Sequence, residues 1–344
     1  MSIKKFTTQL EGRDFSIETG HMAGQANGAV LVQYGLTSVL VTATMASKTK
    51  EIDYFPLTVD FEERFYAAGK IKGSRWVKRE TRPSEEAILT ARLIDRALRP
   101  RFDQRIRNEV QVVATVLSFD GQNDPDIPAL VGASTALMIS DIPFAGPVAA
   151  SRVGIAEKDY LLNPVYADRE KSKFDLVVAG TKDRINMIEA GANIVNEKIM
   201  IDGIDFGFKQ YQKLIDFQKQ IAEELAPKKA DLELSEITED LIMKARDFLG
   251  DKLEKAIFTP DHNQMKKNLS ELRKSFKDYI NEQHKNDSDL GKTLQQAENI
   301  LDKEMDILVH KNAIEKDKRA DGRKMDELRQ LTVEIGVLPR NHGS

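Results

Sequence analysis

The pattern of hydrophobic and polar positions divides the chain into parts of different character. Up to about residue 205, short Val-rich runs alternate with helix-like segments, as strands and helices of a mixed domain do. The strand-like runs are 28–34, 38–44, 109–118 and 174–180, and the helix-like segments are 84–99, 129–139 and 193–204. This alternation predicts an α/β or α+β domain over residues 1–208.

The composition changes after residue 208. Lys, Glu, Gln, Leu and Ile dominate, and apolar residues recur three or four positions apart, as in Leu214, Phe217, Ile221 and Leu225. This spacing predicts amphipathic helices. We therefore expect an all-helical domain over 209–310, with three or four helices and a charged surface that mostly faces solvent.

The last segment, 311–344, changes character again. A Gly-containing turn precedes an apolar stretch at Leu331–Val337, which reads as a strand. A lone strand leaves its backbone groups without partners. Both "SIETGHMAGQANGA" (16–29) and "VEIGVLPRNHGS" (333–344) hold Glu-x-Gly followed by a later Gly. This faint match suggests that a second copy of the first domain begins here and is cut off.

Composition narrows the class of protein. The 344 residues are 41% hydrophobic and 31% charged, contain no cysteine, and begin without the apolar core of a signal peptide. No run of apolar residues is long enough to cross a membrane. Disulfides and thiolate metal sites are excluded. We expect a cytoplasmic protein with no membrane partner.

Charge is distributed unevenly along the chain. The formal net charge is −4, yet residues 70–107 hold twelve Lys and Arg against five Asp and Glu. A local positive excess of this size indicates a surface for phosphate groups. Within it, "ILTARLIDRALRPRF" (88–102) reads as a buried helix that carries arginines on one face.

Three arginines share that face. Arg92, Arg96 and Arg99 follow the i, i+4, i+7 spacing that places side chains together on a helix. Asp95 can pair with some of them, so a structural salt bridge is one interpretation. One carboxylate does not neutralise three guanidiniums, however. The alternative is that the stripe binds phosphate, for which the planar fork of Arg is suited.

Several long motifs are similar to those of the bacterial polynucleotide phosphorylase family. They are "ERFYAAGKI" (63–71), "RETRPSEEAILTARLIDRALRPRF" (79–102), "DIPALVGASTALMISDIPFAGPVAASRVG" (126–154), "DLVVAGT" (175–181), "MIEAGA" (187–192) and "RADGRKMDELR" with "GVLPRNHGS" (319–344). The resemblance covers the whole chain in order. It implies a first RNase PH-like core of the ribosomal protein S5 domain 2-like type over 1–208. A helical linker domain over 209–310 and the first strand of a second core over 311–344 would follow.

The resemblance also implies an activity. The family forms ring-shaped homotrimers that remove nucleotides from the 3′ end of single-stranded RNA with inorganic phosphate, releasing nucleoside diphosphates reversibly. No DNA partner is expected. In the family the arginines matching Arg92 and Arg96 face the substrate cleft between the two cores, and Arg99 is a weaker candidate for the same phosphate-binding site.

Chemistry in this family belongs to the second core, where carboxylates hold Mg²⁺ and a Lys assists. In the present chain those positions fall on Arg169, Lys173, Asp175 and Val177. One carboxylate beside two cations is a poor Mg²⁺ site. The resemblance therefore implies a catalytically silent first core that binds no metal. Mg²⁺ ligands of the full enzyme are expected beyond residue 344.

The loop before the arginine helix matches the family's loop at the ring entrance. Trp76, Lys78, Arg79 and Arg82 combine an aromatic face for base stacking with charges for phosphates, as single-stranded RNA requires. The loop is one residue longer than in the family and has one aromatic fewer. A core position for Trp76, the only tryptophan, is the alternative.

Three functional hypotheses follow. The chain is the amino-terminal part of a phosphorolytic exoribonuclease whose active site lies beyond Ser344. Alternatively, it is by itself a non-catalytic RNA-binding or trimer-scaffolding module. In the third, the gene product ends at Ser344 and does neither. A continued reading frame would separate the first from the third.

Overall fold

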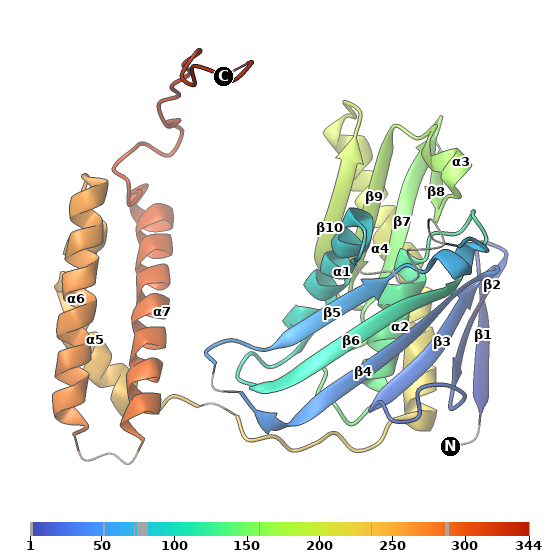
Figure 1. Ribbon diagram of the computed structural model, residues 1–344, viewed down its shortest axis with the longest axis horizontal. Helices are drawn as coiled ribbons and strands as arrows, with labels where there is room; N and C mark the ends of the chain where they lie inside the picture. Colours follow the sequence, from blue (N-terminus) through green and yellow to red (C-terminus); the bar gives the residue numbers. More distant parts are fainter. Residues whose placement is uncertain are drawn as a thin grey trace. The chain divides into compact units, whose positions relative to one another are not determined.

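The computed structural model describes residues 3–50, 52–71, 73, 82–157, 159–234, 236–285 and 289–343. The chain forms two compact units, Met1–Ser235 and Glu236–Ser344. Figure 1 shows the strands gathered in the first unit and a group of long helices in the second.

Two sheets build the first unit (Figure 1). The larger has six strands in the order β1-β2-β3-β4-β6-β5; all neighbours are antiparallel except β5 and β6. Its strands are β1 (Lys4–Leu10), β2 (Arg13–Thr19), β3 (Gly28–Tyr34), β4 (Thr37–Thr49), β5 (Leu57–Glu62) and β6 (Asn108–Ser118). Strict alternation of buried and half-buried residues along β3 shows that one sheet face lies on the core.

The smaller sheet has four antiparallel strands in the order β10-β9-β7-β8. They are β7 (Ala149–Ala156), β8 (Asp159–Leu162), β9 (Phe174–Gly180) and β10 (Ile185–Ala192). All but one residue of β9 are buried, as its Val-rich sequence predicts for a central strand.

Helices join the two sheets into one core. They are α1 (Glu85–Leu98), α2 (Asp126–Met138), α3 (Tyr166–Arg169) and α4 (Glu197–Leu225), with short 3-10 turns η1 (Phe65–Ala68) and η2 (Arg99–Arg101). α2 is buried along nearly its whole length between β3 and β4 on one side and β7 on the other. Gly132 allows this approach, because a Cβ there would lie 2.7 Å from Val32 Cγ2.

The boundary expected at residue 208 lies inside α4 and not between domains. The second half of α4 buries Tyr211, Leu214 and Ile215 in the core of the first unit. The following segment belongs there too, because Lys229 Nζ donates to the carbonyl oxygens of Leu137, Met138 and Ser140 at 2.6–3.0 Å. The 3.6-residue periodicity after 208 was that of a helix covering a sheet. The helical unit therefore begins near residue 236.

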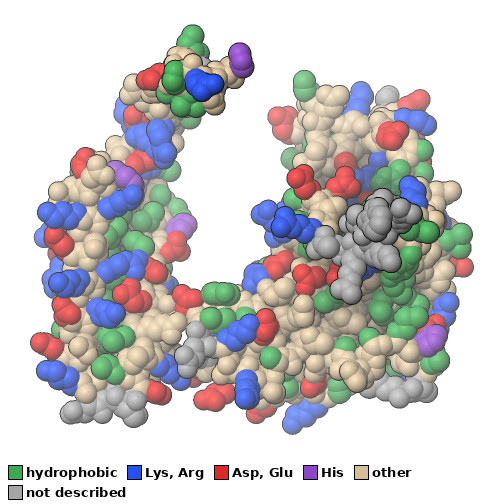
Figure 2. Space-filling model, in the orientation of Figure 1, with side chains coloured by type: hydrophobic (Ala, Val, Ile, Leu, Met, Phe, Trp, Pro, Cys, Tyr) green, Lys and Arg blue, Asp and Glu red, His purple; other side chains and the backbone are tan. Residues whose placement is uncertain are grey.

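The second unit is built from α5 (Glu239–Ile257), α6 (His262–Gln283) and α7 (Leu290–Lys316). Their apolar faces meet around Phe276, Ile280 and Leu301. In Figure 2, Lys and Arg side chains are interspersed with Asp and Glu over these helices, as expected of a solvated surface.

The strand expected at Leu331–Val337 is absent, and the structure assigns no helix or strand to the described residues 317–343. Leu331, Val333, Ile335 and Val337 are all exposed. A strand requires a partner for its backbone groups. These alternating apolar residues have none among the described residues.

Candidate functional site

α1 presents the arginine stripe on a firmly anchored helix. Ser84 caps its N-terminus by accepting a hydrogen bond from Ala87 N at 3.0 Å, and Glu85 and Glu86 complement the helix dipole. One face packs on β5 and β10. The expectation of an otherwise buried helix was wrong in part, since Ile88 and Leu89 are 48% and 55% exposed. α1 therefore has an open apolar face beside its arginines.

Arg99 has a structural role in this arrangement. Its Nε and Nη2 bond Asp95 at 2.7 and 2.5 Å, and its Nη1 and Nη2 donate to the carbonyl oxygens of Phe55 and Leu57. The hydrogen bonds that Arg99 donates to Asp95 are the main reason that the pKa of Arg99 is raised. The salt-bridge interpretation thus holds for this residue. We leave Arg99 out of the phosphate-binding site.

Arg96 has a partner that the sequence did not reveal. Its Nη1 lies 3.0 Å from Glu189 Oε2, and its Nη2 donates to Ile188 O at 3.1 Å; both come from β10. The side chains of Arg96 and Glu189 are each 47% exposed. A half-exposed pair of this kind is weak. Glu189 therefore holds Arg96 only weakly.

Arg92 is exposed and has no hydrogen-bond or ion-pair partner among the described residues. With Arg96 it lines an open cavity of about 440 Å³ between α1 and β5. The other lining residues are Val59, Asp60, Phe61, Pro83, Ala87, Ile88, Ala91 and Asp95. Of the two acids in this cavity, Asp95 is paired with Arg99, whereas Asp60 accepts a hydrogen bond from the neutral amide of Gln111 and keeps its charge. The guanidinium of Arg92 thus faces the cavity without an ion-pair partner among the described residues.

The expected RNA-binding loop is mostly outside the described residues. Trp76, Lys78 and Arg79 all fall there, so their predicted role stays a prediction. Arg82 is described and exposed, two residues before the cap of α1. It lies next along the chain to Pro83, which lines the cavity. Arg82 can thus extend the same positive surface.

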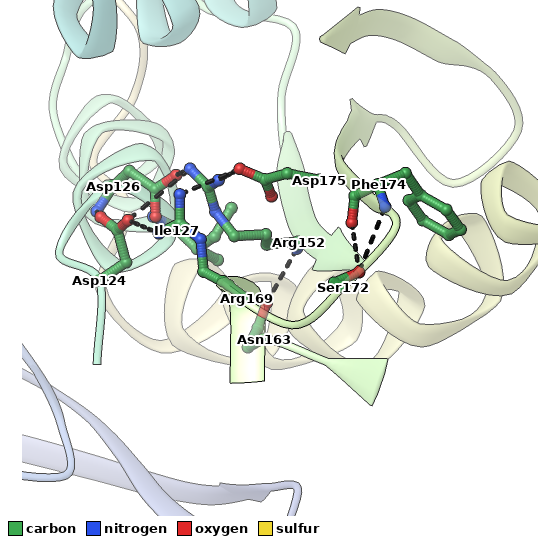
Figure 3. A network of polar contacts seen from close by, with 9 residues as sticks. All are labelled: Asp124, Asp126, Ile127, Arg152, Asn163, Arg169, Ser172, Phe174 and Asp175. Carbon is green, nitrogen blue, oxygen red and sulfur yellow. Dashed lines mark hydrogen bonds and ion pairs between the residues drawn. The ribbon is translucent and has the colours of Figure 1, made fainter. Parts of the chain in front are cut away.

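The position at which the resemblance places the family's metal site holds a network of ion pairs (Figure 3). Arg169 binds Asp124 at 2.5 Å and Asp175 at 3.0 Å. Arg152 binds Asp126 at 2.6 Å and also contacts Asp175. Three carboxylates thus converge on two guanidiniums.

Burial shifts the pKa values of the groups in this network. Burial raises the pKa of Asp124 to about 6; the neighbouring charge of Asp126 adds to the effect, while Arg152 and Arg169 oppose it. Burial also acts to raise the pKa of Asp126, but the charge and hydrogen bond of Arg152 hold it below its ordinary value. Partial burial acts to lower the pKa of Arg152, whose side chain is 12% exposed, yet the same carboxylates raise it. The guanidiniums are therefore the permanent counter-ions of the carboxylates.

This donor set does not fit Mg²⁺. The cation requires carboxylate oxygens that are free to coordinate it, and here they are bonded to Arg152 and Arg169. Among the described residues, no group of three or more His, Cys, Asp or Glu side chains is arranged to hold a metal ion. Of the network, the sequence singled out Arg169 and Asp175. Asp124 and Asp126 were missed because "NDPDIP" reads only as a turn, and Arg152 was missed because no local pattern connects it to them.

Comparisons with known proteins identify the family of the chain. Two sequence models described as "3' exoribonuclease family, domain 1" and "domain 2" match residues 11–143 and 146–210. Proteins named polyribonucleotide nucleotidyltransferase from Halothermothrix orenii and Bacillus subtilis are each 44% identical, over 99% and 98% of this chain. The chain belongs to this exoribonuclease family.

The resemblance to polynucleotide phosphorylases is thus confirmed. The chain spans about half the length of these relatives, 49% and 47% respectively. The solved structure of Rrp46 from rice aligns with a TM-score of 0.51 at 15% identity, covering 62% of this chain and 96% of that one. This match confirms the RNase PH-like fold. In the described part of the chain, no helix has the length and apolarity to span a membrane.

Proposed function

We propose that the chain is the amino-terminal part of a phosphate-dependent 3′-to-5′ exoribonuclease that degrades single-stranded RNA to nucleoside diphosphates and can run in reverse. The observation that carries this proposal is the 44% identity to polyribonucleotide nucleotidyltransferases along almost the whole chain. A homotrimer in the cytoplasm belongs to the same proposal.

Within that enzyme, this core binds substrate and does no chemistry. Arg92 and Arg96 supply positive charge on an open cavity, and the exposed apolar residues beside them are suited to contact with a further domain or with bases. Arg152 and Arg169 occupy the carboxylates at the family's metal position. The Mg²⁺ of the full enzyme therefore requires ligands outside residues 1–344, for which the length of the relatives leaves room.

Two assays on the 344-residue chain test this division of labour. In the first, the chain is incubated with poly(A), phosphate and Mg²⁺, and we expect no release of ADP above background. In the second, the anisotropy of a fluorescent oligoadenylate is measured at low salt, and we expect saturable binding. ADP release that persists after repurification contradicts the proposal. Trimer formation without any RNA binding favours a scaffolding module.

A further inference from the structure

A second positively charged cavity lies at the opposite end of α1 from its capping Ser84. It has a volume of about 280 Å³ and shares no lining residue with the Arg92 cavity. Its walls come from four separate segments of the first unit: η2, the turn before β7, the β9–β10 turn and α4. The lining residues are Arg101, Gly146, Pro147, Thr181, Lys182, Asp183, Arg184, Ile215 and Lys219.

The charge of this cavity is strongly positive. Arg101, Lys182, Arg184 and Lys219 face one acid, Asp183. No ion pair joins any of these five side chains to a partner among the described residues. In a chain of net charge −4, four unpaired cations around one hollow repel one another unless an anion neutralises them.

Hydrogen bonds order the segments that carry these cations. Thr181 N donates to Arg184 O at 2.8 Å, which closes the β9–β10 turn, and Tyr211 Oη on α4 donates to Thr181 O at 3.2 Å. Arg101 is fixed to the turn before β7: Ala145 N donates to its carbonyl oxygen at 2.9 Å, and its Nε donates to Ala145 O at 2.7 Å. The Nη1 of Arg101 keeps its donors free among the described residues. A binding site ordered in advance loses little entropy on binding.

We propose that this cavity binds a small phosphate-bearing anion of the diphosphate type. Its volume lies just below the range for small-molecule sites, about 300–1,000 Å³, and suits a small anion. The donors are Arg and Lys, which bind phosphate oxygens through charge-assisted hydrogen bonds. Ile215 provides an apolar floor that is completely buried. This inference is independent of the proposed function, because none of its residues belongs to the Arg92 site.

The test is calorimetric titration of the 344-residue chain with inorganic pyrophosphate at low ionic strength. The paired change Arg184→Gln with Lys219→Gln should weaken binding at least tenfold. The matched control is Lys198→Gln with Lys213→Gln, which removes two exposed lysines from α4 outside the cavity. The control should bind like the original chain. All four side chains are exposed or half-exposed, so circular dichroism should show the same melting temperature for both variants.

Two further measurements distinguish this cavity from the Arg92 cavity and a small anion from RNA. Arg92→Ala with Arg96→Ala should retain pyrophosphate binding at this cavity. Equal binding by the Arg184 and Lys219 variant and its control overturns the proposal. If instead Arg184 and Lys219 affect only the affinity for oligoadenylate, the cavity is part of an RNA path and the small-anion site is wrong. Added salt should weaken pyrophosphate binding, because partly exposed charges are screened.

Discussion

Arg169 Nη2 lies 3.0 Å from Asp175 Oδ2. By the resemblance, Asp175 falls at a metal-ligand position of the family's second core; here its carboxylate is bonded to a guanidinium, and Arg152 contacts the same oxygen. Under the proposed function, two permanent cations occupy the position at which a catalytic core would hold a metal ion. We infer that the ion pairs at this position stabilise the first core.

Replacing Arg152 should destabilise the protein strongly. Arg152→Met leaves Asp126, whose side chain is 3% exposed, without its cation. An unpaired buried charge costs about 3–5 kcal/mol, which chemical denaturation should show as a lower free energy of unfolding. The control Lys209→Met breaks the exposed Asp205 pair and should cost less than about 1 kcal/mol. Equal, small decreases for both variants would mean that the network does not stabilise the fold.

The raised pKa of Asp124 predicts a pH dependence of stability. Its folded pKa of about 6 lies above the unfolded value of 3.8. The stabilising contribution of its proton is therefore complete below pH 4 and is lost as the pH rises through 6, by an amount of about 3 kcal/mol. Denaturation at several pH values should show this decrease in the original chain and not in Asp124→Asn. A constant difference between the two proteins from pH 4 to pH 7 contradicts the assignment.

Arg99 and Arg92 should separate stability from binding. Arg99→Ala removes four hydrogen bonds and frees Asp95, so the free energy of unfolding should fall by about 1–3 kcal/mol. Arg92→Ala removes an exposed side chain without a described partner and should leave the free energy of unfolding unchanged. The affinity for oligoadenylate should fall for Arg92→Ala and stay the same for Arg99→Ala. A lower melting temperature of the Arg92 variant would mean that Arg92 stabilises the fold and does not serve as a binding residue.

The domain boundary can be tested with fragments. A fragment of residues 1–235 should fold cooperatively, whereas 1–208 should not. The shorter fragment lacks Tyr211, Leu214 and Ile215, each of which is almost fully buried. At about 1.5–3 kcal/mol for each such side chain, their removal is comparable with the whole stability of a domain. Thermal melting by circular dichroism measures this, and equal transitions for both fragments would restore the boundary at 208.

Local patterns in the sequence were good guides where burial was continuous. The Val-rich runs at β3, β4, β6 and β9 were found because buried strands are apolar along most of their length. β1 was missed because "KKFTTQL" has few apolar residues and lies at a sheet edge. The expected strand at Leu331–Val337 failed for the opposite reason, since its pattern is right and no partner strand lies among the described residues.

The candidate site was only partly visible in the sequence. Helical spacing placed Arg92, Arg96 and Arg99 on one face, and Asp95 was rightly suspected as a partner of Arg99. Glu189 is 93 positions from Arg96, so no local pattern connects the two residues. The same holds for Asp124 and Arg169, which are 45 positions apart and meet only in the folded chain. Long-range pairs decide which arginines remain free for a ligand.

Under the proposed function, α1 binds RNA phosphates while this core performs no chemistry. The most direct measurement is the oligoadenylate affinity of the 344-residue chain, by fluorescence anisotropy over a range of salt concentrations. Arg92→Ala with Arg96→Ala should weaken binding and flatten the salt dependence by roughly one unit of slope for each phosphate group that the variant no longer binds. The control Lys266→Ala with Lys267→Ala removes two exposed cations from α6 and should change neither. Equal affinities and slopes for the two variants would contradict the claim.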